Sequence, residues 1–91
     1  MTKTKATKRL TERKRMVDMQ LRGLSAKRAL LDCGLTEFMP YVLAQAIQER
    51  TILTAKERLR ISQILNGNVS PKDADLLGLL ERAVVGAKAA A

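Results

Sequence analysis

The sequence predicts an all-α protein, a small bundle of about five helices with a helix-turn-helix-like segment. Three observations lead to this class. The 91 residues suit one domain and leave no room for a second core. No stretch alternates apolar and polar residues over the length of a strand, and β-branched residues are scattered. Residues that start and stop helices, in contrast, divide the chain into short segments.

The chain is expected to begin with a flexible basic arm, residues 1–9, and a basic helix. This first helix should run from about Lys8 or Thr11 to Arg22, because Gly23 is a natural helix stop. Its apolar positions form an imperfect stripe, made of Leu10, Met16, Val17, Met19 and Leu21.

A short helix, a turn and a longer helix are expected next. Ser25 favours the start of a helix over residues 26–33, and Gly34 ends that helix. Pro40 is tolerated only in the first turn of a helix, so the third helix should begin between residues 36 and 40 and run to about residue 50. The side chains expected to face the core are those of Val42, Leu43, Ala46 and Ile47.

The fourth helix opens with the clearest local signal in the chain. Thr54 and Glu57 have the spacing of a capping box, in which each side chain bonds to the backbone N–H of the other residue. Residues 66–68 (Asn-Gly-Asn) are expected to end this helix. The side chains expected to be buried are those of Leu59, Ile61, Ile64 and Leu65.

The fifth helix should start at Ser70, with Pro71 at its first position and Asp73 in its first turn. It should run to Val85, with Gly86 as a break before a frayed tail.

This last helix is apolar most of the way round. A helix with more than one apolar face is either deeply buried or shared with another chain. We therefore expect residues 51–91 to form a helical hairpin that also joins copies of the chain into a homo-oligomer. The contacts between copies are expected at Leu76, Leu79, Leu80 and Val84. The alternative is that the first and third helices cover these residues within one chain.

The positive charge lies in the first third of the chain. The net charge is +8, and residues 1–28 alone hold ten basic and two acidic side chains. In residues 29–91, seven basic and seven acidic side chains cancel. Such an asymmetry is typical of an interaction surface for a polyanion.

The region from residue 10 to 50 contains a helix-turn-helix pattern and a resemblance to a known family. Residues 25–50 have the proportions of this motif. Residues 10–36 combine a basic first helix, a Gly23-Leu24-Ser25 turn, a second helix of small residues, and a glycine shortly before Thr36. In these features the segment resembles the amino-terminal region of small terminase subunits from tailed bacteriophages.

This resemblance implies a helix-turn-helix that recruits viral DNA for packaging, a ring of subunits, and a large terminase subunit as partner. Two positions differ from the pattern of the family. Leu35 stands where an aromatic residue is usual, and Pro40 stands where the recognition helix should be under way.

We therefore expect a protein that binds nucleic acid, preferably DNA, mainly through its phosphates. The residues expected to bind are Lys3, Lys5, Lys8, Arg9, Arg13, Lys14, Arg22, Lys27, Arg28, Tyr41, Gln45 and Gln48. The first alternative is a small factor that docks on an acidic host protein, and charge alone does not separate the two. A basic helix on an anionic membrane is disfavoured, because the first helix lacks a clean apolar face.

The side chains that most enzymes and metal sites require are missing. There is no histidine, and Cys33 is the only cysteine, which excludes an internal disulfide and an ordinary zinc site. No glycine-rich phosphate loop is present. We therefore expect no enzymatic activity, no cofactor, no metal and no small-molecule substrate. Without a signal sequence or an apolar run of about eighteen residues, the expected location is the cytoplasm.

Overall fold

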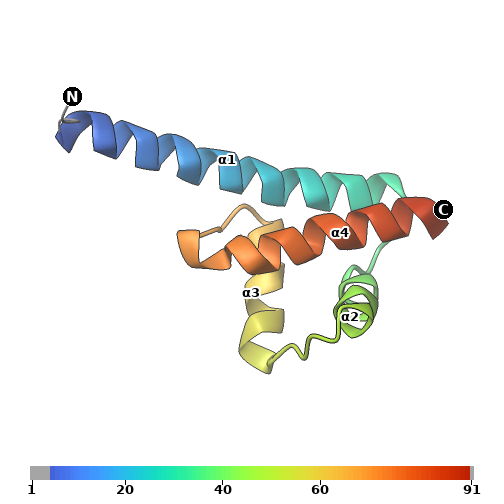
Figure 1. Cartoon of the computed structure of the whole chain (residues 1–91). Helices are drawn as coiled ribbons and strands as arrows, with labels where there is room; N and C mark the ends of the chain where they lie inside the picture. Colours follow the sequence, from blue (N-terminus) through green and yellow to red (C-terminus); the bar gives the residue numbers. More distant parts are fainter. Residues whose placement is uncertain (1–4, 91) are drawn as a thin grey trace.

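The protein consists of four α-helices and one short 3-10 helix (Figure 1). A computed structural model describes the backbone of residues 5–90 and the side chains of residues 11–89. The elements in chain order are α1 (Lys5–Asp32), α2 (Met39–Gln48), α3 (Ala55–Leu65), η1 (Pro71–Asp73) and α4 (Ala74–Ala90). Residues 5–90 contain no strand. The all-α class is confirmed, with four α-helices where about five were expected.

The long helix α1 replaces two expected helices, and the prediction of a stop at Gly23 was wrong. Gly23 is buried against the end of α3, where an added Cβ atom would overlap the carbonyl oxygen of Ile64. Glycine costs a helix interior about 1 kcal/mol relative to alanine. Here the absence of a side chain permits α1 and α3 to touch, so packing outweighs the local preference.

The expected flexible arm is only partly described. Lys5 to Arg9 belong to α1, so the expectation was wrong for these residues. The expectation for residues 1–4 lies outside the described residues.

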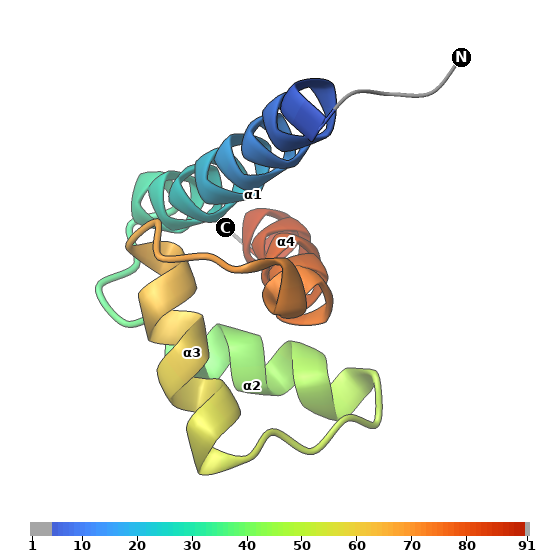
Figure 2. The ribbon, with the colours of Figure 1, turned by 90° about the vertical axis from the view of Figure 1, so that its left-hand side faces the viewer.

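Helix α4 is the centre of the fold. It lies between α1 and α2, and α3 closes one side of the assembly (Figures 1 and 2). Leu77 and Leu80 of α4 are fully buried in one core together with Leu30 of α1, Val42 of α2 and Ile61 of α3. The core therefore draws on every α-helix of the described chain.

The residues expected to join copies of the chain are covered within a single chain. Leu79, Leu80 and Val84 are buried, and Leu76 is half-buried against the same core. The alternative weighed above, coverage within one chain, is the arrangement observed. It comes from α1 and α2, on which α4 packs more extensively than on α3. Residues of α3 and α4 thus share one core with α1 and α2.

The ends of α3 are confirmed. The Thr54 hydroxyl accepts from the Glu57 backbone N–H, and the Glu57 carboxylate accepts from the Thr54 backbone N–H, both at 3.1 Å. Gly67 follows the helix with φ +87°, a conformation that favours glycine. Leu59, expected to be buried, is exposed, because α3 packs through the side that carries Ile61 and Ile64.

The starts of α2 and of the last helical segment also agree with those expected from the sequence. Pro40 lies in the first turn of α2, and Ser70 precedes η1. Two other expectations were wrong. Ile47 of α2 is exposed, and α4 continues through Gly86 to Ala90 without a break.

The expected helix-turn-helix of residues 25–50 is not formed. Its first helix is the last part of α1, and residues 33–38 connect it to α2. Helix α2 then packs mainly against α4 and makes little contact with α1. The apolar side of α2, with Val42 and Ala46, faces α4 because that helix supplies a continuous row of leucines.

Candidate nucleic-acid interface

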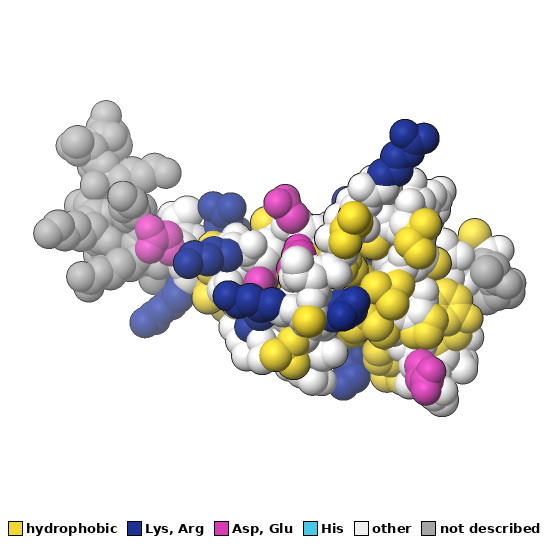
Figure 3. Space-filling model, turned by 90° about the horizontal axis from the view of Figure 1, so that it is seen from below, with side chains coloured by type: hydrophobic (Ala, Val, Ile, Leu, Met, Phe, Trp, Pro, Cys, Tyr) yellow, Lys and Arg dark blue, Asp and Glu magenta, His cyan; other side chains and the backbone are white. Residues whose placement is uncertain are grey.

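Helix α1 carries a run of exposed cations near its start. Arg13, Lys14, Arg15 and Arg28 are exposed, and none of them forms an ion pair among the residues the structure describes. The first turns of α1 extend beyond the other helices (Figure 1). On the face seen in Figure 3, Lys and Arg side chains lie toward the end of the molecule where α1 begins and also over its middle. This part of α1 is therefore open to a large partner.

Two of the predicted cations have structural partners. The Arg22 guanidinium pairs with the Glu81 carboxylate of α4, with a second hydrogen bond from Nε at 3.1 Å. The hydrogen bond to Glu81 raises the pKa of Arg22. Lys27 donates from Nζ to Oδ1 of Asn66 at 3.0 Å. Arg22 therefore contributes to the contact between α1 and α4 and is no longer an unneutralised cation.

The remaining cations predicted near the start of the chain are less fully described. Lys5, Lys8 and Arg9 lie in the first turns of α1, where the backbone alone is described. Lys3 lies outside the described residues. Sequence reasoning left out Arg15, which the structure places among the exposed cations of α1.

The residues expected to read bases do not share a surface with the cations of α1. Tyr41 and Gln48 of α2 are exposed, but the half-buried Gln45 donates from Nε2 to Oε2 of Glu49 at 2.6 Å. Helix α4 lies between α1 and α2 (Figure 2). The structure thus places the predicted cations of α1 and the predicted base-contacting residues of α2 on different surfaces.

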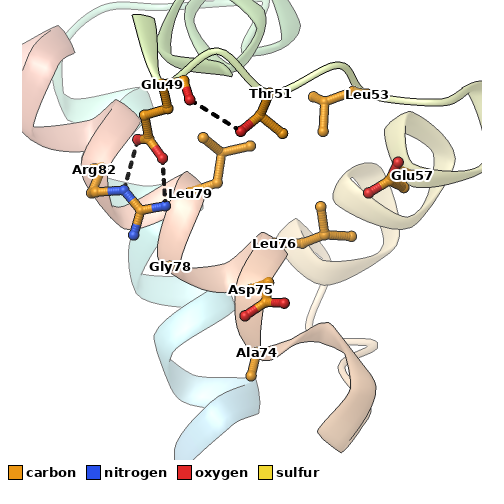
Figure 4. A pocket seen from close by; sticks show the side chains of 10 residues that line it. All are labelled: Glu49, Thr51, Leu53, Glu57, Ala74, Asp75, Leu76, Gly78, Leu79 and Arg82. Carbon is orange, nitrogen blue, oxygen red and sulfur yellow. Dashed lines mark hydrogen bonds and ion pairs between the residues drawn. The ribbon is translucent and has the colours of Figure 1, made fainter. Parts of the chain in front are cut away.

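The pocket between the start of α4 and the connector that follows α2 is acidic. Its volume is about 430 Å³, and Glu49, Glu57 and Asp75 contribute carboxylates to its lining (Figure 4). Arg82 donates to both oxygens of Glu49, at 2.7 and 2.8 Å. This hydrogen bonding is the main cause that lowers the pKa of Glu49. Phosphate groups are therefore not suited to this pocket.

Sequence reasoning missed this pocket because its lining comes from segments far apart in the chain. Residues 49–57 and 74–82 meet there only once α4 has docked. Glu49 and Arg82 are 33 positions apart, so no local pattern could have paired them.

Two further classes of site receive no support from the described residues. Residues 5–90 contain no group of three or more His, Cys, Asp or Glu side chains that could hold a metal ion. Within the same part of the chain, no helix has the length and apolarity that crossing a membrane requires. No protein-family model, curated protein or solved structure matches the chain in the comparisons.

Proposed function

We propose that the protein binds nucleic acid without catalysis, preferably duplex DNA, and that α1 carries the affinity. The single observation that carries this proposal is the set of exposed cations on α1 that no carboxylate neutralises: Arg13, Lys14, Arg15 and Arg28. Four further cations precede them in the sequence, at Lys3, Lys5, Lys8 and Arg9.

The physical basis is the release of counterions. Each Lys or Arg that neutralises a phosphate frees condensed cations from the nucleic acid, so the affinity falls as salt is added. Contacts of this kind position a protein on DNA but carry no sequence information. The proposed binding is therefore strong at low salt and only weakly dependent on base sequence.

The resemblance of residues 10–36 to small terminase subunits adds a narrower proposal, in which the DNA is a viral genome recruited for packaging. Helix α1 runs through Gly23 without the helix-turn-helix of that family. The narrower proposal therefore rests on the sequence resemblance alone.

The test compares two variants with the same net charge. The first replaces Arg13, Lys14, Arg15 and Arg28 by Gln, and the second replaces the exposed Lys56, Arg58, Lys72 and Lys88 by Gln. Affinity for a short duplex is measured by fluorescence anisotropy at several salt concentrations. We expect the first variant to reduce the slope of log affinity against log salt by up to about 3.6, at roughly 0.9 for each lost phosphate contact. The second variant should retain most of the slope.

Equal losses in the two variants would mean that net charge, and not α1, determines binding. An affinity of the unmodified protein that does not change between low and moderate salt would contradict the proposal. Tight binding of an acidic protein together with no binding of duplex DNA would favour the alternative partner.

A further inference from the structure

The solvent side of α1 carries a row of large apolar side chains. Val17, Leu21, Leu24 and Leu31 lie on the side opposite the buried residues of this helix. Their exposed fractions are 49%, 55%, 45% and 50%, respectively. They follow one another at intervals of four, three and seven residues, which is the spacing of a coiled-coil heptad. We name this row, together with Lys14 before it and Arg28 within it at the remaining core heptad positions, the α1 seam.

The seam becomes visible only because α1 is continuous. Treating Gly23 as a helix stop separates Val17 and Leu21 from Leu24 and Leu31. In the structure the four side chains lie along one helix, over a length of about 21 Å at 1.5 Å per residue. Leu24 lies over Gly67 of the turn that follows α3, and about half of each of the four side chains still faces solvent.

We infer that the α1 seam binds the α1 seam of a second copy, as a parallel two-stranded coiled coil. The argument is charge complementarity at the positions that flank the seam. One flank carries Arg13, Gln20 and Lys27, which are g positions if Leu21 is assigned to position a. The other flank, the e positions, carries Asp18, Ser25 and Asp32.

In a parallel pair, a g residue of one chain meets the e residue five positions later in the other chain. Arg13 then faces Asp18 of the second copy, and Lys27 faces its Asp32. Asp18, Asp32 and Arg13 form no ion pair within the described part of one chain. The ammonium of Lys27 has three donors, so its bond to Asn66 leaves two for a carboxylate.

The antiparallel arrangement brings like charges together. There g meets g and e meets e, so that Arg13 and Lys27 of the two copies approach each other, as do Asp18 and Asp32. Like-charge neighbours on facing helices destabilise the pair. The charge pattern therefore selects the parallel orientation.

Lys14 and Arg28 occupy seam positions at which charged side chains lower stability but restrict the number of strands. Their aliphatic stems can cover the apolar row while the charged ends reach solvent. The folded state of each copy favours association through this short seam, because α3 and α4 already hold α1 as a helix. Association then does not have to order the backbone.

This inference deepens the proposed function. It rests on that function in one respect, because it takes nucleic acid as the ligand of the dimer. A parallel pair brings the basic first turns of both α1 helices to the same end of the coiled coil. Paired basic helices that diverge from a coiled coil can enter the major groove of one duplex. The dimer would therefore present two copies of Arg15, and of the cations that precede Arg13 in the sequence, to a single site on DNA.

The first experiment measures molecular mass by sedimentation equilibrium. We expect the unmodified protein to reach twice its monomer mass of 10.1 kDa at micromolar to submillimolar concentration. Replacing Leu21 and Leu24 by Glu should return the mass to that of the monomer. Replacing Leu59 by Glu, an exposed leucine on α3, is the matched control and should leave the dimer intact. Circular dichroism verifies that each variant is folded.

Two further variants test the orientation. Asp18→Arg should weaken dimerisation at least tenfold, and Arg13→Asp added to it should restore the dimer, because only the parallel pair joins these two positions. In a Cys33→Ser background, Leu24→Cys should form an intermolecular disulfide with itself under mild oxidation. Crosslinking only when Leu21→Cys chains are mixed with Leu24→Cys chains would indicate the antiparallel pair and overturn the inference.

The outcomes separate this inference from the proposed function. A monomer at all concentrations that still binds DNA with a steep salt dependence would overturn the dimer and leave the function in place. A dimer that does not bind duplex DNA would support the coiled coil and contradict the proposed function. Monomers that bind vesicles of anionic phospholipid, and lose that binding in the Leu21→Glu, Leu24→Glu variant, would assign the seam to a membrane surface and overturn the dimer.

Discussion

Gly23 illustrates how a residue that often ends helices can instead hold two of them together. Its position over the carbonyl group of Ile64 leaves no room for a side chain. We expect Gly23→Ala to lower the free energy of unfolding by about 1–3 kcal/mol, as overpacking at a close contact does. This loss should appear although alanine is the better helix former. Urea unfolding followed by circular dichroism measures the change.

Gly86 supplies the control for this substitution. It also lies within a helix, but a Cβ atom there would have Gln45 Oε1 as its nearest neighbour, at an ordinary 3.7 Å. Gly86→Ala should therefore raise the free energy of unfolding by up to about 1 kcal/mol. If both substitutions stabilise the protein, the close approach of α1 to α3 is refuted.

The connection between α3 and η1 depends on a buried carboxylate. Asp73 pairs with Arg60 of α3 and also accepts from the backbone N–H of Ser70 at 2.8 Å and its hydroxyl at 3.2 Å. The hydrogen bond from Arg60 is the main cause that lowers the pKa of Asp73 below its ordinary value of 3.8. Arg60 also donates to the carbonyl oxygen of Asn68 at 3.2 Å, which fixes the intervening turn.

This pairing predicts a specific loss of stability in acid. Since the pKa of Asp73 is lower in the folded state, its contribution is present above pH 3.8 and disappears as the pH falls through the folded value. Asp73→Asn should lower stability at pH 7 by about 1–3 kcal/mol and flatten the decline below pH 4. Urea midpoints between pH 2 and pH 7 measure both effects. An equal response of Asp75→Asn, at an exposed neighbouring position, would assign the effect to general charge.

The helices that the sequence predicted best are those whose ends depend on nearby residues. The capping box of α3 needs only atoms three residues apart, so Thr54 and Glu57 were sufficient to locate its start. The continuity of α1 depends on Ile64, far along the chain, and could not be read from the segment around Gly23. Local signals therefore fixed where helices begin better than how they pack.

The candidate site, too, could be predicted from the sequence only in part. The excess of cations in the first third of the chain could be counted directly from the sequence. The neutralisation of Arg22 could not, because Glu81 lies 59 positions later and meets it only through the packing of α1 on α4. A count of charges thus predicts the kind of partner but not which charges are free to meet it.

The whole molecule is held together through one helix. Leu80 of α4 is fully buried in the core to which α1, α2 and α3 all contribute. We expect Leu80→Ala to lower the free energy of unfolding by about 2–5 kcal/mol, a large part of the roughly 5–15 kcal/mol of a small domain. Thermal unfolding should show one transition at a lower temperature. Val85→Ala, at an exposed position of the same helix, should change stability by less than about 0.5 kcal/mol. Similar effects of the two substitutions would contradict the central place of α4.

The position of α4 in the chain has a consequence for biosynthesis. A ribosome makes α1, α2 and α3 before it makes the helix that joins α1 to α2. Until residues 74–90 have left the exit tunnel, Leu30 and Val42 have no leucine row to cover them. The nascent chain must therefore pass through a stage in which these apolar side chains remain in water, where a chaperone could bind them.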